Sequence, residues 1–454
     1  MESRLVSLDR FSATEVALEE PDRYRDLLDR PWTDGALIAR GAGLSYVAAS
    51  FGQDVVSVGM RHFNRILALD TRAGWIEVEA GITLGELFAF LTPRKLFLPV
   101  QPGYPGITVG GCIALNVHGK NQFRDGTFRS QILGITLFHP DHGILELSEA
   151  RDPEILELTA GGMGLTGMVL RVRLKVAQLR SASVRVRHIP VTSLAEAFAK
   201  VAQLTGEYDL LYSWNDLSAF DRNQGRGYVT AARFLDEAGV RNKTGLQNET
   251  GIREFPKVTG RSKLDPCQKR FRPNLFNDVC MRPINRIYHA LGTFDPRERG
   301  VSLGQFLFPA VGREFYFDWF GPPGFLETQM LIPGERIDAY LEDFIPLLRN
   351  HGRPVALTTI KAFRGERSLL NYDGSGFSFT LDVANRPENL AFFGNLDTLN
   401  GKFGVLSNLA KDSRLPVGVV REQYGAGYDL FRKRLREFDP KRRFVSSLSR
   451  RLEL

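Results

Sequence analysis

The segment from Gly106 to Asn121 (GITVGGCIALNVHGKN) combines the residue types that a site for a flat or anionic group requires. Gly110 and Gly111 remove side chains where a backbone must come close to such a group. His118 and Lys120 follow shortly afterwards and supply polarity and charge. The segment is therefore either one wall of a buried cofactor ring or a glycine-rich turn before a buried strand.

Two further glycine-rich loops favour the cofactor interpretation. The turn from Arg40 to Gly43 follows an apolar strand-like run, and successive backbone N–H groups in such a turn form a concave anion site suited to a pyrophosphate. The stretch from Thr159 to Val169 (TAGGMGLTGMV) is again rich in glycine and leads into the alternating run LRVRLKV. One such loop is weak evidence. Three of them, each joined to a β-like run, predict a dinucleotide site built from loops.

The motifs RGAGLSY, GITVGGCIALNVHGKN and GGMGLTG, in this order, resemble the FAD-binding domain of the vanillyl-alcohol-oxidase (PCMH-type) flavoproteins. Within that superfamily the chain is most similar to the family of decaprenylphosphoryl-β-D-ribose 2-oxidases. The motifs that carry this second likeness are HGKN, GPPGFLETQMLIP (Gly321 to Pro333), AKDSR (Ala410 to Arg414) and the terminal SRRLEL. The likeness runs from about residue 36 to the C-terminus, with a weaker middle.

The resemblance implies FAD as the cofactor, with the turn from Arg40 to Tyr46 on the pyrophosphate and Thr108 to Gly111 behind the flavin. Leu44 stands where lactone-oxidising relatives carry a histidine that bonds covalently to the flavin, so we expect FAD to be held non-covalently. Cys112 is expected to be a buried filler rather than a flavin attachment point. The implied cofactor-binding residues are Ala39, Arg40, Gly41, Ala42, Gly43, Leu44, Ser45, Tyr46, Gly103, Thr108, Val109, Gly110, Gly111, His118, Gly119, Lys120, Asn121, Gly164, Val169 and Asn408.

Oxidation of a sugar hydroxyl by a flavin needs a hydride path to the flavin N5 and a group that receives the hydroxyl proton. Lys411, within AKDSR, matches the family's active-site lysine, which contacts both the flavin and the substrate. His118 is the other polar group expected beside the ring. The sequence does not decide which of the two takes the proton. Without the resemblance, Lys411 is a surface lysine and His118 a hydrogen-bonded structural histidine.

The substrate pocket that the resemblance implies is also polar. Lys361 interrupts the apolar run of TTIKAF, so its charge needs a partner, either a phosphate ester or Asp382 in FTLDV. Thr380 stands where the family often has a cysteine, and Leu307 where a tyrosine is expected, so the exact substrate is the least determined feature. The implied substrate-binding residues are Lys120, Gln329, Lys361, Thr380, Asp382 and Lys411.

The function implied is oxidation of C2 of a polyprenylphosphoryl-β-D-ribofuranose to the 2-keto sugar. A separate NAD(P)-dependent short-chain reductase would then complete a ribose-to-arabinose epimerisation in cell-wall or glycan biosynthesis. One alternative is an FAD-dependent oxidase of a soluble alditol, sugar lactone or glycosylated metabolite. The other is a non-catalytic flavin-binding or scaffold protein.

The composition is that of a globular protein, with 454 residues, 43% of them hydrophobic and 24% charged. The net charge of +7 favours anionic ligands or an anionic membrane surface. No zinc spacing, helix-turn-helix signal or aromatic–basic RNA motif is visible, so we expect no metal and no nucleic acid. Three cysteines argue against a disulfide framework and for a reducing compartment.

The start of the chain shows no signal peptide, and no apolar run has the length of a transmembrane helix. We therefore expect a cytoplasmic protein or one held peripherally at the inner face of the membrane. The basic run from Arg432 to Arg451 is either a solvated helix and tail or a surface that docks on anionic lipid.

These residues require an α+β chain of two domains. We expect a PCMH-type FAD-binding domain over residues 1–177, completed by 413–454, and a substrate domain over 178–412 with an antiparallel sheet flanked by helices. We also expect four helices. The first two are a helical lead-in around Glu19 to Leu28 and a helix capped by Thr83. The other two are a helix over Glu335 to Asn350 that is kinked or ended near Pro346, and a helix over Gln423 to Phe438 that returns to the first domain. The polar stretch 241–283 is either a solvated loop or a mobile flap over the substrate mouth.

Overall fold

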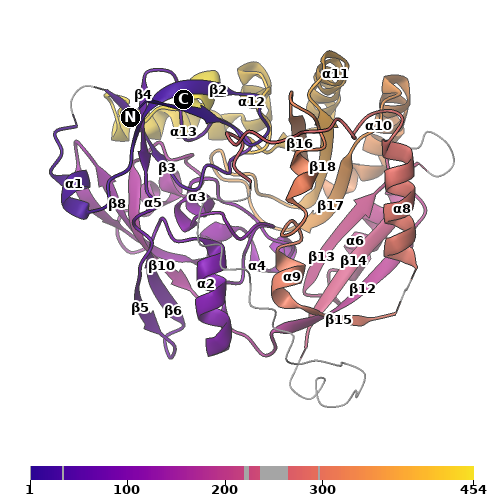
Figure 1. Ribbon diagram of the computed structural model, residues 1–454, viewed down its shortest axis with the longest axis horizontal. Helices are drawn as coiled ribbons and strands as arrows, with labels where there is room; N and C mark the ends of the chain where they lie inside the picture. Colours follow the sequence, from indigo (N-terminus) through magenta and orange to yellow (C-terminus); the bar gives the residue numbers. More distant parts are fainter. Residues whose placement is uncertain (1, 33–34, 219–223, 236–263, 295–296) are drawn as a thin grey trace.

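Two groups of sheets lie side by side in the computed structural model, one built from the indigo-to-magenta part of the chain and the other from the magenta-to-orange part (Figure 1). The structure describes residues 2–32, 35–218, 224–235, 264–294 and 297–454. Its mixture of helices and sheets confirms the predicted α+β class. Within these residues, no helix combines the length and the apolar character that crossing a bilayer requires.

The first group contains a four-stranded sheet, order β1-β2-β4-β3, and an antiparallel five-stranded sheet, order β5-β6-β10-β8-β9. Its strands are β1 (Glu2–Val6), β2 (Ala13–Glu19), β3 (Ala36–Arg40), β4 (Val55–Gly59), β5 (Ile66–Asp70), β6 (Trp75–Glu79), β8 (Ile132–His139), β9 (Gly143–Leu147) and β10 (Met168–Lys175), with β7 (Leu96–Phe97) and β11 (Ala177–Gln178) as a separate pair. Its helices are α1 (Tyr24–Leu28), α2 (Leu84–Leu91), α3 (Val109–Ala114), α4 (Gln122–Asp125) and α5 (Pro153–Thr159).

Helix α2 begins where the sequence predicts. The Thr83 hydroxyl accepts a hydrogen bond from the Glu86 amide (3.2 Å), and the Glu86 carboxylate accepts one from the Thr83 amide (2.8 Å). This reciprocal capping box satisfies two amide groups that the first turn of a helix leaves without partners. The prediction of Thr83 as the N-cap is therefore confirmed.

The helix expected around Glu19 to Leu28 is present as α1, which begins at Tyr24, and Glu19 ends strand β2 instead. Residues 2–19 form the antiparallel hairpin of β1 and β2, and only α1 is helical. Leu5 and Val16 of the hairpin are buried against Ala48 and Phe51. These partners lie far along the chain, so tertiary packing outweighs local helix propensity here.

The second group contains two antiparallel four-stranded sheets, with orders β13-β14-β12-β15 and β17-β18-β16-β19, as the sequence predicts for this half. Its strands are β12 (Ser183–Val191), β13 (Leu210–Asn215), β14 (Gly227–Phe234), β15 (Arg299–Ser302), β16 (Phe325–Ile332), β17 (Leu357–Phe363), β18 (Gly376–Ala384) and β19 (Leu406–Ser407). Its helices are α6 (Leu194–Leu204), α8 (Met281–Thr293), α9 (Leu303–Leu307), α10 (Ile337–His351) and α11 (Pro387–Phe403).

One face of the β17-β18-β16 sheet is apolar. Met330 of β16 and Phe379 of β18 are fully buried, in a core that also contains Phe344 of α10 and Phe393 of α11. Successive side chains of a strand point to opposite faces. The other face of the same sheet is therefore left to residues that do not belong to this core.

One of the expected helices is continuous and another is divided. Helix α10 does not end at Pro346, because Phe344 and Leu348 on either side of it are fully buried and their packing outweighs the lost backbone hydrogen bond. The helix expected over residues 423–438 is divided into α12 (Val417–Tyr424) and α13 (Ala426–Phe438) by Gly425, which adopts a φ of +50°.

The predicted polar loop is partly helical. Residues 241–263 of this stretch lie outside the described part of the chain, so the flap interpretation is not tested there. Residues 264–280 form turns and one isolated bridge, from Asn274 to Phe320, and α8 begins at Met281.

Segments distant in sequence tie the two groups of sheets together. After α13 the chain returns to β3, where Leu37 donates to Arg443 O (2.7 Å) and accepts from the Val445 amide (2.9 Å), before ending in α14 (Ser447–Arg451). At the other end, Asp9 O accepts a hydrogen bond from the Phe325 amide at the start of β16 (3.1 Å). The domain boundaries at 177 and 413 remain a prediction.

The apolar face of the β17-β18-β16 sheet gives a test of the fold. Phe379 is fully buried and contacts Phe198 and Phe344, with ring centroids 5.6 and 5.4 Å away. The Phe379→Ala change should lower the free energy of unfolding by about 3–5 kcal/mol, because it leaves a cavity in this core. Urea unfolding monitored by circular dichroism measures the loss. The Phe271→Ala control removes a side chain that is 88% exposed and should change this quantity by less than about 0.5 kcal/mol.

Candidate active site

The polar face of the second sheet gathers four of the side chains that form the candidate site. In the antiparallel pairing of β16 with β18, Glu327 lies opposite Asp382, and Gln329 opposite Thr380. Directly opposed residues point to the same face, so these four side chains share it. All four are at least 95% buried. They are therefore shielded from bulk water on the side that faces the first group of sheets.

Gln329 connects this face to the glycine-rich segment. Its side-chain oxygen accepts a hydrogen bond from Asn408 Nδ2 (2.6 Å) and lies 3.2 Å from His118 Nε2, while its amide nitrogen donates to Thr380 Oγ1 (3.1 Å). The His118 ring also packs edge-on against Phe363, with centroids 4.8 Å apart. The structure thus brings His118, Gln329, Thr380 and Asn408 together, as the sequence predicts for a common site.

His118 is neutral in this environment. Burial first, and the positive charge of Lys361 second, lower the pKa of its imidazole to about 3. Both ring nitrogens face carbonyl oxygens, Nδ1 that of Gly119 and Nε2 that of Gln329. A neutral ring donates to only one of them. His118 is therefore a poor proton acceptor at neutral pH and is suited to orienting a polar group.

Lys411 lies at the meeting point of three segments. Its ammonium is 3.2 Å from the Glu327 carboxylate and 3.4 Å from the centre of the Tyr46 ring. The ammonium therefore lies between a carboxylate and an aromatic face, and both attract a cation. Tyr46 belongs to the turn 40–46, so this contact joins the predicted cofactor turn to the predicted catalytic lysine.

Glu327 and Asp382 form a buried pair of carboxyl groups. Asp382 Oδ2 accepts a hydrogen bond from the Tyr316 hydroxyl (2.7 Å), and its other oxygen has no hydrogen-bond partner among the described residues. Burial first, and the negative charge of Glu327 second, hold the pKa of Asp382 well above its ordinary value. Two adjacent buried carboxyl groups cannot both ionise without cost, so the pair retains a proton. The raised pKa of Asp382 places this proton on its carboxyl, and the Glu327 carboxylate contacts Lys411.

Lys361 and Asp382 do not pair with each other, contrary to one expectation. Lys361 lies opposite Ser378 on β18, four residues from Asp382, a distance of about 13 Å along a strand. Lys361 points to the polar face and has no hydrogen bond or ion pair with any residue that the structure describes. Burial first, and the charge of Lys411 second, lower the pKa of Lys361 to about 8. An unpaired cation in such a place is suited to an anionic ligand.

The first glycine-rich turn has the features of an anion site. The backbone amides of residues 42–46 donate no hydrogen bond to any residue that the structure describes, and Gly43 has a φ of +70°. The buried Ser45 hydroxyl is likewise without a partner among the described residues. Successive free amides beside an unsatisfied hydroxyl fit the diphosphate of FAD. Leu44 offers only an alkyl side chain in this turn.

The three glycine-rich loops meet in space. A Cβ on Gly41 would lie 2.2 Å from the Thr108 hydroxyl, so the turn 40–46 and the start of α3 are in direct contact. The third loop also meets α3, since the Gly161 amide donates to Ile113 O (2.8 Å) and the Met163 amide to Ala114 O (2.7 Å). Helix α3 replaces the turn-before-strand interpretation of this segment.

Some predicted cofactor residues have structural partners instead. Asn121 Nδ2 donates to Pro99 O (3.0 Å), and Lys120 Nζ donates to Leu307 O (2.8 Å). Burial lowers the pKa of Lys120 to about 7. Gly103 lies on the surface with open space around it. Their roles toward FAD remain predictions, as do those of the other residues of the set.

Three further positions show what the sequence reasoning did and did not find. Cys112 is fully buried in an apolar core, which raises its pKa, so it is the filler expected. Glu327 and Tyr316 were not predicted as site residues. Glu327 could have been found, because it precedes Gln329 by two residues in FLETQMLI and must share its face. Tyr316 lies in the part of the chain where no motif is visible.

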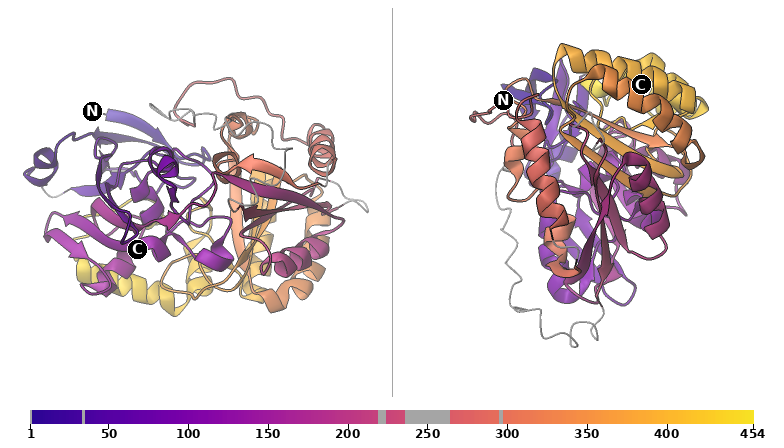
Figure 2. Two further views of the ribbon diagram at one scale, coloured as in Figure 1. Left: turned by 90° about the horizontal axis from the view of Figure 1, so that it is seen from below. Right: turned by 90° about the vertical axis from the view of Figure 1, so that its right-hand side faces the viewer.

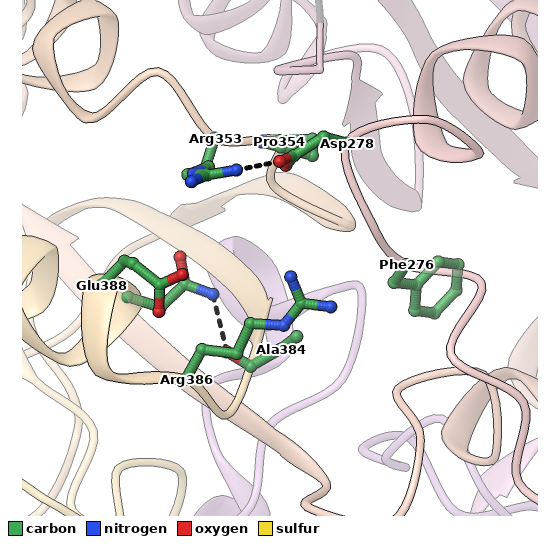
Figure 3. A pocket seen from close by; sticks show the side chains of 8 residues that line it. Phe276, Asp278, Arg353, Pro354, Ala384, Arg386 and Glu388 are labelled. Atoms are coloured by element: carbon green, nitrogen blue, oxygen red, sulfur yellow. Dashed lines mark hydrogen bonds and ion pairs between the residues drawn. The ribbon is translucent and has the colours of Figure 1, made fainter.

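Two hollows outside this cluster do not suit the cofactor. One, beside Phe276 and the Arg353–Asp278 ion pair, has a volume of about 10 Å³, room for about one water molecule (Figure 3). The other, of about 400 Å³, is lined by Glu149, Glu154, Glu157, Glu366 and Asp373 against the single cation of Arg129. Its carboxylates would repel a diphosphate.

Known proteins resemble both halves of this arrangement. Residues 30–148 match the profile of a family described as FAD binding domain. The chain is 27% identical over 451 residues to decaprenylphosphoryl-beta-D-ribose oxidase of Mycolicibacterium smegmatis, covering 97% of this chain and 95% of that protein. It is 26% identical to an uncharacterized protein of the mprA 5′ region of Streptomyces coelicolor, covering 82% and 100%. L-gulonolactone oxidase of Bos taurus is 30% identical over 122 residues, 27% of this chain and 28% of that protein.

The matched FAD-binding profile contains both the turn 40–46 and helix α3, which the structure places in contact. The likeness to the mycobacterial oxidase extends beyond that profile through the sheet that carries Glu327, Gln329 and Asp382. FAD is therefore the cofactor, and the chemistry is oxidation of a CH–OH group. Residues 30–148 are an FAD-binding domain, and the chain is similar over almost its whole length to an FAD-dependent oxidase.

Proposed function

We propose that the chain oxidises C2 of a polyprenylphosphoryl-β-D-ribofuranose to the 2-keto sugar. The observation that carries this proposal is the composition of one sheet face, where Lys361 lies unpaired on the same side as Glu327 and Gln329. Glu327 and Gln329 can form hydrogen bonds with a sugar hydroxyl, and the Lys361 cation can bind a phosphate ester. The likeness to an oxidase named for such a donor supports the same choice.

FAD bound at this site would accept the hydride at its N5 atom. The free amides of residues 42–46 and the Ser45 hydroxyl would bind its diphosphate. Because Leu44 has no nucleophilic atom and Cys112 is enclosed in the core, we infer that the cofactor is held without a covalent bond.

The carboxyl pair is the strongest candidate for the proton acceptor. The Lys411 ammonium already contacts the Glu327 carboxylate, and burial lowers the pKa of His118 to about 3. Lys411 would stabilise the developing alkoxide, and the hydroxyl proton would pass to the Glu327 carboxylate that contacts it. Asp382, which already holds a proton, would position the Glu327 side chain, because it lies directly opposite Glu327 on the same sheet face.

An oxidase of a soluble alditol or sugar lactone is the alternative. The match to L-gulonolactone oxidase covers only 27% of this chain. The unpaired Lys361 favours a donor that carries an anionic group. A non-catalytic flavin-binding role is set aside, because two of the three relatives named here are oxidases.

We further propose a separate NAD(P)-dependent short-chain reductase as the next enzyme and a peripheral place at the inner face of a membrane. Several cations of the C-terminal basic run have partners within the protein. Arg434 contacts Glu157 (2.7 Å), Arg443 contacts Asp141 (3.2 Å) and Arg451 donates to Asp412 O (2.8 Å), so these cations are engaged within the protein.

The proposal is tested by mixing the purified holoenzyme anaerobically with polyprenylphosphoryl-β-D-ribose and following flavin absorbance. The donor should bleach the flavin. Bleaching should be slowed roughly a hundredfold or more in Lys411→Ala, which removes the charge that stabilises the alkoxide. The matched change Lys402→Ala, at a lysine whose side chain is 65% exposed, should leave the rate unchanged. A flavin that stays oxidised with this donor but bleaches with a free alditol would favour the alternative substrate.

Lys361 gives a prediction on pH. Its charged form exists below its pKa of about 8, so kcat/KM for the phosphate-bearing donor should fall as the pH rises through that value. Lys361→Gln should lower kcat/KM about tenfold at pH 7. The fall of kcat/KM above about pH 8 should also disappear, because glutamine has no charge to lose. Steady-state rates from pH 6 to about 9.5 measure both effects. In Lys120→Gln, kcat/KM should still fall as the pH rises through about 8. If this fall disappears in Lys120→Gln, it is caused by Lys120 and not by Lys361.

Glu327→Gln tests the proton acceptor. The amide keeps the shape of the side chain but cannot take a proton, so flavin reduction in single-turnover experiments should slow by roughly a hundredfold. The FAD content should stay the same, since Glu327 touches no residue of the turn except Tyr46. Glu335→Gln, an equivalent change at an exposed glutamate, should have no effect. Unchanged reduction in Glu327→Gln would exclude this carboxylate as the acceptor.

A further inference from the structure

Helix α8 turns its more apolar side toward solvent. Its buried positions are Met281, Asn285 and Gly292, of which only the first is a large apolar residue. On the opposite side, Ile287, Leu291 and the residue that follows the helix, Phe294, are 62%, 72% and 90% exposed. Residues three or four positions apart on a helix are neighbours on its surface, so these three form one stripe. A water-soluble surface rarely keeps such a stripe uncovered.

The orientation of α8 is fixed by specific contacts. Asn285 Nδ2 donates to the buried Asp216 carboxylate (2.9 Å), and His188 Nδ1 donates to Gly292 O (2.8 Å). A Cβ on Gly292 would lie 2.1 Å from the Tyr228 ring, so the helix backbone rests directly on β14. Because the polar and small side of the helix is used for these contacts, α8 cannot roll over to bury its apolar stripe.

The charge around the stripe is positive. Residues 279–294 contain no aspartate or glutamate, and Arg286 directly precedes Ile287 of the stripe, whereas Arg282 Nε donates to Ser218 O (3.2 Å). Both arginines are exposed. An exposed helix with apolar residues on one side, arginines beside them and no acidic residue is typical of helices that lie in the interface of an anionic bilayer.

The start of α8 is continuous with one wall of the active site. Met281 shares an apolar cluster with Phe276, Phe320 and Phe325, against which Tyr46 and Tyr316 pack. Just before the helix, Asp278 pairs with Arg353, which fixes this segment to the connection between α10 and β17 (Figure 3). The segment 264–280 and α8 lie along the same edge of the molecule in both views of Figure 2.

We propose that the stripe of Ile287, Leu291 and Phe294, with Arg286, docks on the surface of an anionic phospholipid bilayer. Docking would hold the wall formed by Tyr46 and Tyr316 near the membrane, where a donor with a polyprenyl chain resides. This last step rests on the proposed function, whereas the docking itself does not. The apolar stripe supplies burial in the lipid, and the arginines supply attraction to its head groups.

The test is co-sedimentation of the full-length holoenzyme with vesicles of phosphatidylglycerol and phosphatidylcholine. The protein should bind the mixed vesicles and bind pure phosphatidylcholine far more weakly. The double variant Ile287→Gln/Leu291→Gln should bind the mixed vesicles at least about tenfold more weakly, because two exposed apolar side chains no longer enter the lipid. Arg286→Glu should weaken binding in the same direction. The control Ile144→Gln, at a side chain that is 50% exposed on β9, should bind as the unmodified protein does.

Three results would overturn the inference. The first is a protein that does not bind the mixed vesicles, and the second is binding that the double variant leaves unchanged. The third is a dimer, detected by light scattering, that the double variant converts to a monomer, since a second copy would then cover the stripe. Vesicle binding without flavin reduction by the lipid-linked ribose would contradict the proposed function alone, and reduction without vesicle binding would contradict the docking alone.

Discussion

The alternation of side chains along β16 and β18 is the constraint on which the site depends. One set of alternate residues, including Met330 and Phe379, is held in a core against helices α10 and α11. The other set, Glu327 and Gln329 with their partners Asp382 and Thr380, must then face the FAD-binding half. A slip of one residue in the pairing would exchange the two sets, so burial of the apolar face fixes the polar face as well. Packing energy on one side of the sheet thereby sets the geometry on the other.

The FAD-binding half contributes mainly backbone groups, rather than side chains, to the candidate site. Its three loops meet at α3 because glycines allow the chains to touch, as Gly41 does at Thr108. The result is a wall with free amides at one end and His118 at the other. Lys411 closes the arrangement from the C-terminal part of the chain, where it bridges Tyr46 and Glu327. Each component of the site therefore comes from a different segment, and the position of each depends on the packing of the others.

Much of this was predictable from sequence where the signal is local. The N-cap of α2 follows from Thr83 and Glu86, and the strands β16 to β18 follow from their apolar alternation. The β1–β2 hairpin was missed because its burial depends on Ala48 and Phe51, which no local pattern reveals. The partner of Lys361 could not be decided either, since the register of β17 with β18 is a property of the folded sheet. Likewise, α8 has the amphipathic spacing of a helix, but the sequence alone does not show which side is buried.

Thr380, at the centre of the polar face, has a consequence for inhibition. Its hydroxyl accepts a hydrogen bond from Gln329, and the resemblance described above implies a cysteine here in many family members. A hydroxyl without an adjacent base does not react with electrophiles that capture a thiolate. Cys112 is enclosed in the core, and neither Cys267 nor Cys280 belongs to the site. A ligand that depends on bonding to a thiol would find no cysteine among the side chains of this polar face.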